Sequence, residues 1–309
     1  MDLNIIQKSF APFADPERST ITQLKHEEDN EPYQVWRIDT ENGSFILKEA
    51  KEFEAEAYQT ILTEVKGNTP ALYKTAIIDD KTYLLIEYVK GSDLCKCDRR
   101  KLTLALDALI IIQKATWESK THADCAYSFE KSLTGRKNRG EYLNDAELDA
   151  AYEKFLQVYE IVPRTLCHDD LLPFNIIVSD DKAVLIDWEY GGILPYPISF
   201  ARLIAHGEDA EGALFYMTQD DREFAVEYYY NNLLKGMGIS YAEWLMTLEY
   251  FLFYEYCEWV FAGNKYGNTD NEYYKKYLPI AKKQAQRILQ SSNCSVSYKA
   301  NHNIRSDIF

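Results

Sequence analysis

The sequence predicts an α+β protein with two lobes: a small lobe built on an antiparallel sheet with one main helix, and a larger, mostly helical lobe. Three observations support this prediction. The first ninety residues carry five short β-branched or aromatic runs, and the residues after Gly91 carry longer runs with apolar residues at helical spacing. The length of 309 residues is also near the limit that one hydrophobic core serves. We expect lobes at residues 1–89 and 90–290, followed by a polar tail at 291–309.

The sheet of the first lobe is predicted from short apolar runs and one turn. Asn42-Gly43 lies between two of the runs and is a strong hairpin signal, because both turn positions need positive φ. The residues from Glu52 to Val65 repeat apolar side chains at helical spacing before Gly67 and Pro70 stop the pattern. The expected strands are Ile21–Leu24, Tyr33–Ile38, Phe45–Lys48, Leu72–Ile78 and Tyr83–Tyr88.

The second lobe is expected to be helical. The segment Lys131–Glu141 holds two glycines and four basic residues, so we expect an exposed loop there. Four glutamates interrupt the aromatic stretch Tyr241–Phe261, which is therefore expected to be a buried helix and not a membrane span. The expected helices are Leu102–Trp117, Asp145–Glu160, Ile198–His206, Asp221–Leu234, Tyr241–Phe261 and Tyr273–Leu289.

The charge and the cysteines limit the class of partner. A formal net charge of −15 argues against nucleic acids and anionic membranes as partners and favours a cationic small molecule. Six cysteines without a leader peptide suggest reduced thiols, so a cytoplasmic location is expected. The sequence does not indicate an oligomeric state.

One motif carries the chemistry. His168, Asp170 and Asn175 have the spacing H-x-D-x-x-x-x-N, and Asp187 follows at the end of an apolar run. Phosphoryl transfer needs a carboxylate that accepts a hydroxyl proton, a nearby amide that holds Mg²⁺, and a second carboxylate that joins the metal to the phosphates. The alternative interpretation is that these residues only tie down a turn and cap a strand.

The order of the motifs resembles the aminoglycoside phosphotransferase and choline kinase family, which has a protein-kinase-like fold. Lys48 ends an expected strand, glutamates follow on the next helix, and Ile86-Glu87-Tyr88-Val89 ends another strand. The loop of the family usually reads H-G-D-x-H-x-x-N, and the strand that follows reads I-D-W-E or I-D-F-E. In this sequence the second motif is Ile186-Asp187-Trp188-Glu189. The resemblance extends from about the second strand through Gly207.

The resemblance implies a kinase that uses ATP and Mg²⁺, with GTP left open as the donor. Lys48 would bind the α and β phosphates, held by Glu54, with Glu56 as the alternative partner. Main-chain groups of Glu87 and Val89 would bind the adenine edge.

The same resemblance assigns the reacting groups. Asp170 would take the proton of the acceptor hydroxyl, a general-base role worth on the order of 10²–10⁴ in rate. Asn175 and Asp187 would hold Mg²⁺, and His168 would support the loop by hydrogen bonding.

The acceptor is expected to be a small, amine-containing alcohol, aminoglycoside-like or choline-like. Besides Asp170, the expected contacts are Glu189, Glu255, Glu258 and Trp259, whose carboxylates and ring suit a cation. For each of these side chains a core or solvated role is the alternative, and neutral sugars and homoserine-like acceptors stay open.

Several residues depart from the family pattern. The turn expected over the nucleotide, His26–Pro32, has no glycine, and Asp169 and Leu172 replace the usual glycine and second histidine. Ser199 stands where an Asp usually anchors the catalytic loop, so loop rigidity is in question. These departures leave a nucleotide-binding pseudokinase or regulatory protein as the alternative function.

Overall fold

The structure is a computed structural model that describes residues 3–15, 17–25, 31–121 and 125–290. Its contacts divide the chain into two compact units, one of residues 1–129 and 164–236 and the other of residues 130–163 and 237–309. The division into lobes at 1–89 and 90–290 stays a prediction. The expected tail at 291–309 lies outside the described residues.

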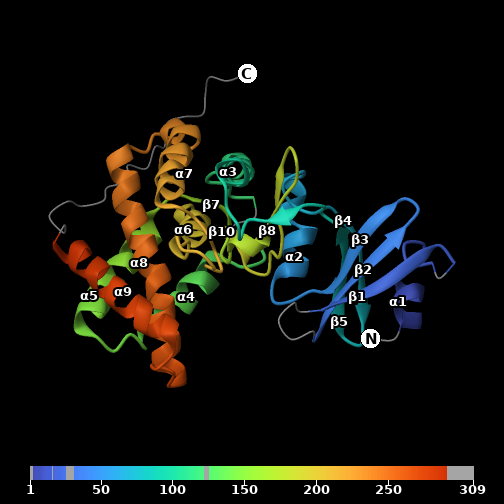
Figure 1. Ribbon diagram of the computed structural model, residues 1–309, viewed down its shortest axis with the longest axis horizontal. Helices are drawn as coiled ribbons and strands as arrows, with labels where there is room; N and C mark the ends of the chain where they lie inside the picture. The colour runs from blue at the N-terminus through green and yellow to red at the C-terminus, as the bar shows by residue number, and fades with distance from the viewer. Residues whose placement is uncertain (1–2, 16, 26–30, 122–124, 291–309) are drawn as a thin grey trace. The chain divides into compact units, whose positions relative to one another are not determined.

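An antiparallel sheet in the order β1-β2-β3-β5-β4 forms the N-terminal part of the first unit (Figure 1). The Asn42-Gly43 turn joins β2 to β3, and Gly43 has φ +136° as such a turn requires. The sheet is formed by β1 (Ser19–Lys25), β2 (Pro32–Thr40), β3 (Gly43–Glu49), β4 (Leu72–Ile78) and β5 (Lys81–Glu87).

One face of this sheet is covered by the chain's first helix, α1 (Leu3–Ser9). Ile6 of this helix, with Phe10 and Ala14 after it, joins a buried cluster with Trp36 and Leu47. Trp36 and Leu47 are opposite each other on β2 and β3, so their side chains share a face. Because successive strand residues alternate in direction, Lys48 points to the other face of the sheet.

Two short helical segments follow β3: α2 (Glu54–Gln59) and the 3-10 turn η1 (Ile61–Glu64). Glu54, Ala57 and Tyr58 are the buried residues of α2, which contacts β5. The helix therefore presents Glu54 on its buried side.

The described residues in the remainder of the first unit form two small sheets and three longer helices. Strand β7 pairs with β10, and β8 lies between β6 and β9. Gly192 of β10 permits a close approach, because a Cβ there would lie 1.9 Å from the carbonyl oxygen of Tyr127. The elements are α3 (Arg99–Ala115), α6 (Pro197–Ala205), α7 (Gln219–Asn232), η2 (Pro173–Asn175), η3 (Leu234–Met237), β6 (Ser92–Asp93), β7 (Arg164–His168), β8 (Ile176–Val178), β9 (Ala183–Leu185) and β10 (Gly191–Pro195).

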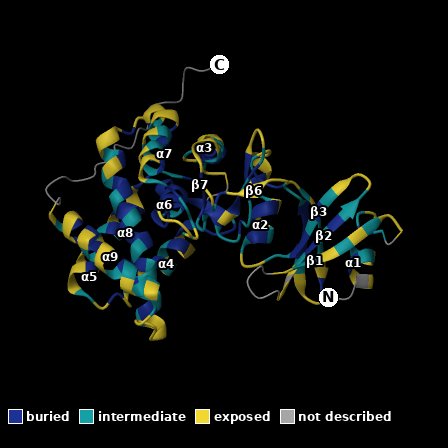
Figure 2. Cartoon of the chain, in the orientation of Figure 1, coloured by how far each residue is buried: buried dark blue, intermediate teal, exposed yellow. Residues whose placement is uncertain are grey.

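The second unit is helical, with α4 (Phe129–Gly140), α5 (Ala146–Ile161), α8 (Tyr241–Tyr266) and α9 (Glu272–Gln290). Helix α8 begins at a capping box made by Ser240 and Glu243 and ends at Gly267, which has φ +66°. Helix α9 buries one side against α5 and α8, and Figure 2 shows buried and exposed residues along it. Its buried residues are Tyr277, Ala281, Gln284, Ala285 and Ile288.

The five expected strands and six expected long helices are confirmed, with their ends shifted by a few residues. The exposed loop expected at Lys131–Glu141 is wrong, because this segment lies within α4 apart from its last residue. Its inner side is polar, which hid the helical pattern. Arg136 is fully buried, with its guanidinium 4.8 Å from the ring centre of Tyr159 and 4.6 Å from that of Tyr254.

No described helix is long and apolar enough to cross a membrane.

Candidate active site

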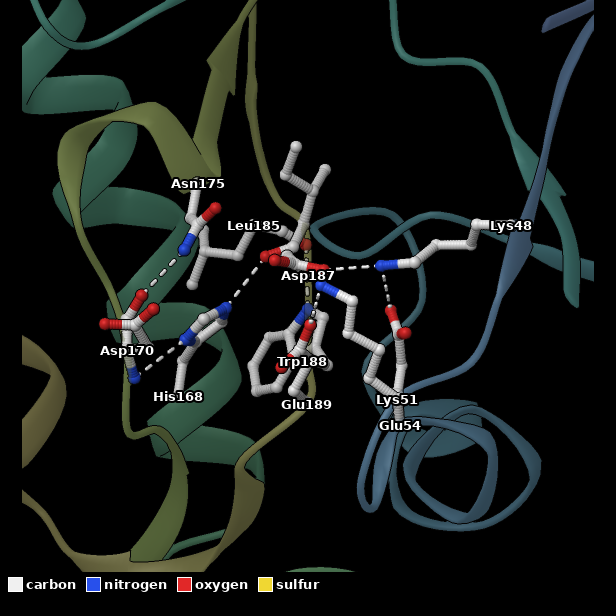
Figure 3. A network of polar contacts seen from close by, with 11 residues as sticks. Lys48, Lys51, Glu54, His168, Asp170, Asn175, Leu185, Asp187, Trp188 and Glu189 are labelled. Carbon is white, nitrogen blue, oxygen red and sulfur yellow. Dashed lines mark hydrogen bonds and ion pairs between the residues drawn. The ribbon is translucent and has the colours of Figure 1, made fainter. Parts of the chain in front are cut away.

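The predicted catalytic loop begins where β7 ends. Strand β7 is held by β10, with His168 opposite Gly191, and the loop turns through η2 to reach β8. After the β8–β9 hairpin, the Ile186 N–H donates to the carbonyl oxygen of Asn175 at 2.9 Å. This bond places Asp187 beside the loop, as Figure 3 shows.

His168 is fully buried and holds the loop through both ring nitrogens. Its Nε2 lies 2.7 Å from the Ile186 carbonyl oxygen, and its Nδ1 lies 3.2 Å from the main-chain nitrogen of Asp170. A neutral ring with its proton on Nε2 satisfies both contacts, since Nδ1 then accepts. Burial lowers the pKa of His168, which favours this neutral form.

Asp170 is oriented from several directions. The Asn175 side-chain amide donates to the Asp170 carbonyl oxygen at 2.8 Å. One carboxylate oxygen of Asp170, Oδ1, accepts hydrogen bonds from both Nε and Nη2 of Arg202, at 3.1 and 2.8 Å. The side chain remains 39% exposed, so a small molecule can reach it. Sequence reasoning missed Arg202.

Lys48, Glu54 and Asp187 form an ion-pair network in which Lys48 and Glu54 are buried and Asp187 is partly exposed. Lys48 Nζ lies 2.8 Å from Glu54 Oε1 and 2.5 Å from Asp187 Oδ1. Burial alone would lower the pKa of Lys48, but the two carboxylates raise it. Burial raises the pKa of Glu54 to about 7 against the effect of Lys48. Glu56 is exposed, so the structure pairs Lys48 with Glu54.

Asp187 has an unusual backbone. Its φ of +65° lies in the left-handed region, which Asp tolerates better than most residues. Burial alone would raise its pKa, but Lys48 lowers it below the ordinary value, so the carboxylate stays charged. The ring of the next residue, Trp188, is buried 4.8 Å from the ring of His168, and its indole N–H donates to the Leu185 carbonyl oxygen at 2.8 Å.

The donor set suits Mg²⁺ shared with phosphates. The Asn175 amide nitrogen is used by Asp170, which turns its oxygen toward a different partner. Mg²⁺ usually takes one or two protein oxygens together with phosphates and water. Among the described residues there is no cluster of three His, Cys, Asp or Glu that could hold a metal ion alone. The side-chain oxygens of Asn175 and Asp187 are donors of the kind that Mg²⁺ binds, and their role in holding the metal stays a prediction.

Ser199 contacts the predicted catalytic loop, whose rigidity the sequence left open. Its fully buried hydroxyl oxygen accepts the main-chain N–H of His168 at 2.8 Å. A hydroxyl oxygen thus does what a carboxylate oxygen would do at this place. Ser199 therefore supplies one contact between α6 and the main chain of the loop.

Three further predicted residues are Glu189, Glu87 and Val89. Glu189 Oε1 is 3.4 Å from Lys51 Nζ, and its side chain is 16% exposed. The Glu87 N–H donates to the Ala71 carbonyl oxygen at 2.9 Å, so a main-chain contact from Glu87 to a base would come from its carbonyl oxygen. Val89 follows β5 and is partly buried. Part of the glycine-free turn, residues 26–30, lies outside the described residues.

Three predicted acceptor residues lie on α8 in the second unit. Glu255 is 2% exposed, and Glu258 pairs with Arg139 at 3.3 Å. The Trp259 ring stacks on Tyr273 with centres 4.4 Å apart. Their role at an acceptor site stays a prediction.

Part of the chain is similar in sequence to curated proteins. Protein LicA from Haemophilus influenzae is 25% identical over 156 residues, which cover 48% of this chain and 54% of LicA. A second Haemophilus influenzae LicA is 24% identical over 148 residues, which cover 46% of this chain and 40% of that LicA. The chain thus spans about half or less of the length of these curated relatives.

Solved structures share the fold. An aminoglycoside phosphotransferase mutant in a ternary complex with AMP-PNP and hygromycin B has a TM-score of 0.60 at 14% identity, covering 94% of this chain and 99% of its own. The choline kinase LicA from Streptococcus pneumoniae has a TM-score of 0.58 at 16% identity, covering 92% and 98%. The predicted protein-kinase-like fold is confirmed.

The model of the phosphotransferase enzyme family matches residues 20–230, which include Lys48, Glu54, the catalytic loop and Asp187. The resemblance stated from the motifs is confirmed. The chain belongs to the phosphotransferase enzyme family.

Proposed function

We propose that this protein is a kinase that transfers the γ-phosphate of ATP, in the presence of Mg²⁺, to a hydroxyl of a small, amine-containing molecule. One observation carries the proposal: Lys48 is fixed on Glu54 and Asp187 in the same unit in which His168 and Asn175 orient Asp170. A nucleotide phosphate site and a base for a hydroxyl are the two parts that phosphoryl transfer needs.

In the proposed reaction, Asp170 accepts the proton of the acceptor hydroxyl through its carboxylate. The hydroxyl oxygen forms a bond to the γ-phosphorus while the bond from that phosphorus to the β,γ-bridging oxygen breaks, and the nucleoside diphosphate leaves. Lys48 stabilises negative charge on the α and β phosphates. Bound by Asn175 and Asp187, Mg²⁺ would neutralise charge on the β and γ phosphates.

The base of the nucleotide would contact the main chain after β5. The Glu87 carbonyl oxygen would accept from the adenine amino group, and Val89 would donate its main-chain N–H to the ring. Guanine carries a carbonyl where adenine carries this amino group, so a contact to the Glu87 oxygen favours ATP over GTP.

The charge of the chain and the names of solved structures with this fold support the proposed acceptor class. The chain has a formal net charge of −15, and Glu189 comes two residues after Asp187. The solved relatives are named choline kinase, ethanolamine kinase and aminoglycoside phosphotransferase, and each name denotes an amine-bearing acceptor. Glu255, Glu258 and Trp259 are the further acceptor contacts that we propose, since carboxylates and an indole ring bind cations.

Free cysteines among the described residues suit the cytoplasm that we propose as the location.

A panel of acceptors tests this proposal. Phosphorylated product is measured by mass spectrometry with choline, ethanolamine, aminoglycosides, neutral sugars and homoserine, each with ATP and with GTP. The proposal expects turnover of an amine-bearing acceptor with ATP. Good turnover of a neutral sugar with no turnover of any amine would overturn the acceptor class and keep the kinase. Nucleotide binding without any transfer would favour the regulatory alternative.

A further inference from the structure

Helix α6 contacts the catalytic loop at two points. Ser199 accepts the His168 main-chain N–H, and Arg202, one helical turn later, donates to the Asp170 carboxylate. Residues three apart lie on the same side of a helix, so one side of α6 holds both the main chain and the reacting side chain of the loop.

The helix itself is firmly placed. Eight of its nine residues are buried, and only Tyr196 separates its first residue, Pro197, from β10, the strand that pairs with β7. The catalytic loop, which holds Asp170, follows β7, and the helix that holds Arg202 follows β10. The two segments therefore extend from a pair of neighbouring strands. The Arg202 guanidinium is therefore carried by a helix that the β7–β10 pair links to the catalytic loop.

The contact leaves one carboxylate oxygen for chemistry. Both Nε and Nη2 of Arg202 bond to Asp170 Oδ1, which sets the rotation of the carboxylate and leaves Oδ2 in a defined position. A guanidinium does not exchange its protons with a carboxylate at ordinary pH, so it orients the base without taking part in the transfer. Its positive charge also offsets the repulsion between Asp170 and an incoming phosphate.

We propose that Arg202 is a positioning residue that holds Asp170 in the geometry needed to accept the acceptor's proton. This inference rests on the proposed kinase function. An ion pair in which Asp170 is 39% exposed and Arg202 21% exposed contributes little to stability, so the effect of its loss falls on turnover.

Steady-state kinetics of Arg202→Met and Arg202→Lys test the proposal. A displaced base costs about 10²-fold in rate, so kcat of Arg202→Met falls on the order of 10²-fold while KM for ATP changes less than about threefold. Lysine supplies one point charge in place of the two-nitrogen fork, so Arg202→Lys recovers part of the lost kcat. Arg99→Met is the control, because Arg99 forms a 2.8 Å pair with Asp221 in the same unit, away from the loop. It leaves kcat unchanged.

Two kinetic results would overturn the proposal: an unchanged kcat in Arg202→Met, or equal losses in Arg202→Met and Arg99→Met. Crystal structures of the wild type and Arg202→Met add a readout that needs no acceptor. The Asp170 carboxylate is expected to adopt more than one orientation in the variant, and a single unchanged orientation would refute the positioning role. If the wild type phosphorylates no acceptor, only the proposed kinase function fails, and this structural comparison still decides the role of Arg202.

Discussion

Glu54 Oε1 accepts a 2.8 Å hydrogen bond from Lys48, and its second oxygen, Oε2, is buried with no hydrogen-bond partner among the described residues. A carboxylate with one oxygen unsatisfied is costly to keep charged in the interior. It is kept because it fixes the ammonium group of Lys48. We expect its value to appear in activity more than in stability.

Replacing Glu54 with Gln is expected to lower kcat/KM for ATP about 10²-fold, because Lys48 then loses one of its two anchors and the phosphates are misplaced. Glu56→Gln serves as the control, since Glu56 is exposed on the same helix, and it is expected to stay within about twofold of the wild type. Initial rates at varied ATP measure both variants. Equal effects of the two changes would contradict the assigned ion pair.

Glu54 should also make stability depend on pH. Its pKa of about 7 in the folded protein lies above the ordinary 4.5. A carboxyl group with a raised folded-state pKa contributes stability that is complete below the unfolded value and is lost as pH rises through the folded value. His168 has the opposite effect, because its lowered pKa gives stability that is lost as pH falls. His168 is present in both the wild type and a Glu54→Gln variant, so its contribution cancels when the two are compared.

The Tm of Glu54→Gln is therefore expected to rise relative to the wild-type Tm as pH increases from about 5 to about 8. Thermal unfolding followed by circular dichroism at several pH values measures this difference. A difference in Tm that stays constant across the range would contradict the raised pKa of Glu54.

Two substitutions of Asp187 separate its charge from its backbone. Asp187→Asn keeps a residue that tolerates the φ of +65°, so the fold should be retained while activity falls about 10³-fold or more through loss of the carboxylate that we propose binds the metal. Asp187→Ala adds backbone strain and is expected to unfold at a lower temperature than Asp187→Asn. Activity assays and melting curves of both variants check these outcomes. Retained activity in Asp187→Asn would refute the metal role.

Ser199→Ala removes the acceptor of the buried His168 N–H. An unsatisfied buried donor costs about 1–3 kcal/mol, and urea unfolding should show a loss of that size. Ser179→Ala is the control, since Ser179 donates to the Lys182 carbonyl oxygen in an exposed hairpin, and a loss below about 0.5 kcal/mol is expected there. Losses of equal size would show that Ser199 does not anchor the loop.

The fold was largely predictable because hydrophobic period and turn residues report strands and helices directly. The Asn42-Gly43 turn predicted one hairpin, and the apolar run before Lys48 predicted the strand that ends there. Helix α4 was missed because its inner side carries Arg136, whose burial depends on two tyrosines far along the chain. The residues near Arg136 in the sequence do not indicate these contacts with the two tyrosine rings.

The candidate site was predictable where chemistry dictates residue type and spacing. His168, Asp170, Asn175 and Asp187 follow one another in a pattern that metal and proton transfer require. Arg202 was not found, because an arginine on a helix that begins 27 residues after Asp170 has no fixed spacing to it. Only tertiary packing brings the two side chains together.

The most direct test is ADP release coupled to acceptor phosphorylation, with ATP and Mg²⁺, for the wild type and for Asp170→Asn. The account predicts turnover in the wild type that depends on the acceptor and on Mg²⁺, and a loss of about 10²-fold or more in Asp170→Asn with ATP binding retained. Wild-type turnover that Asp170→Asn leaves intact would contradict the account.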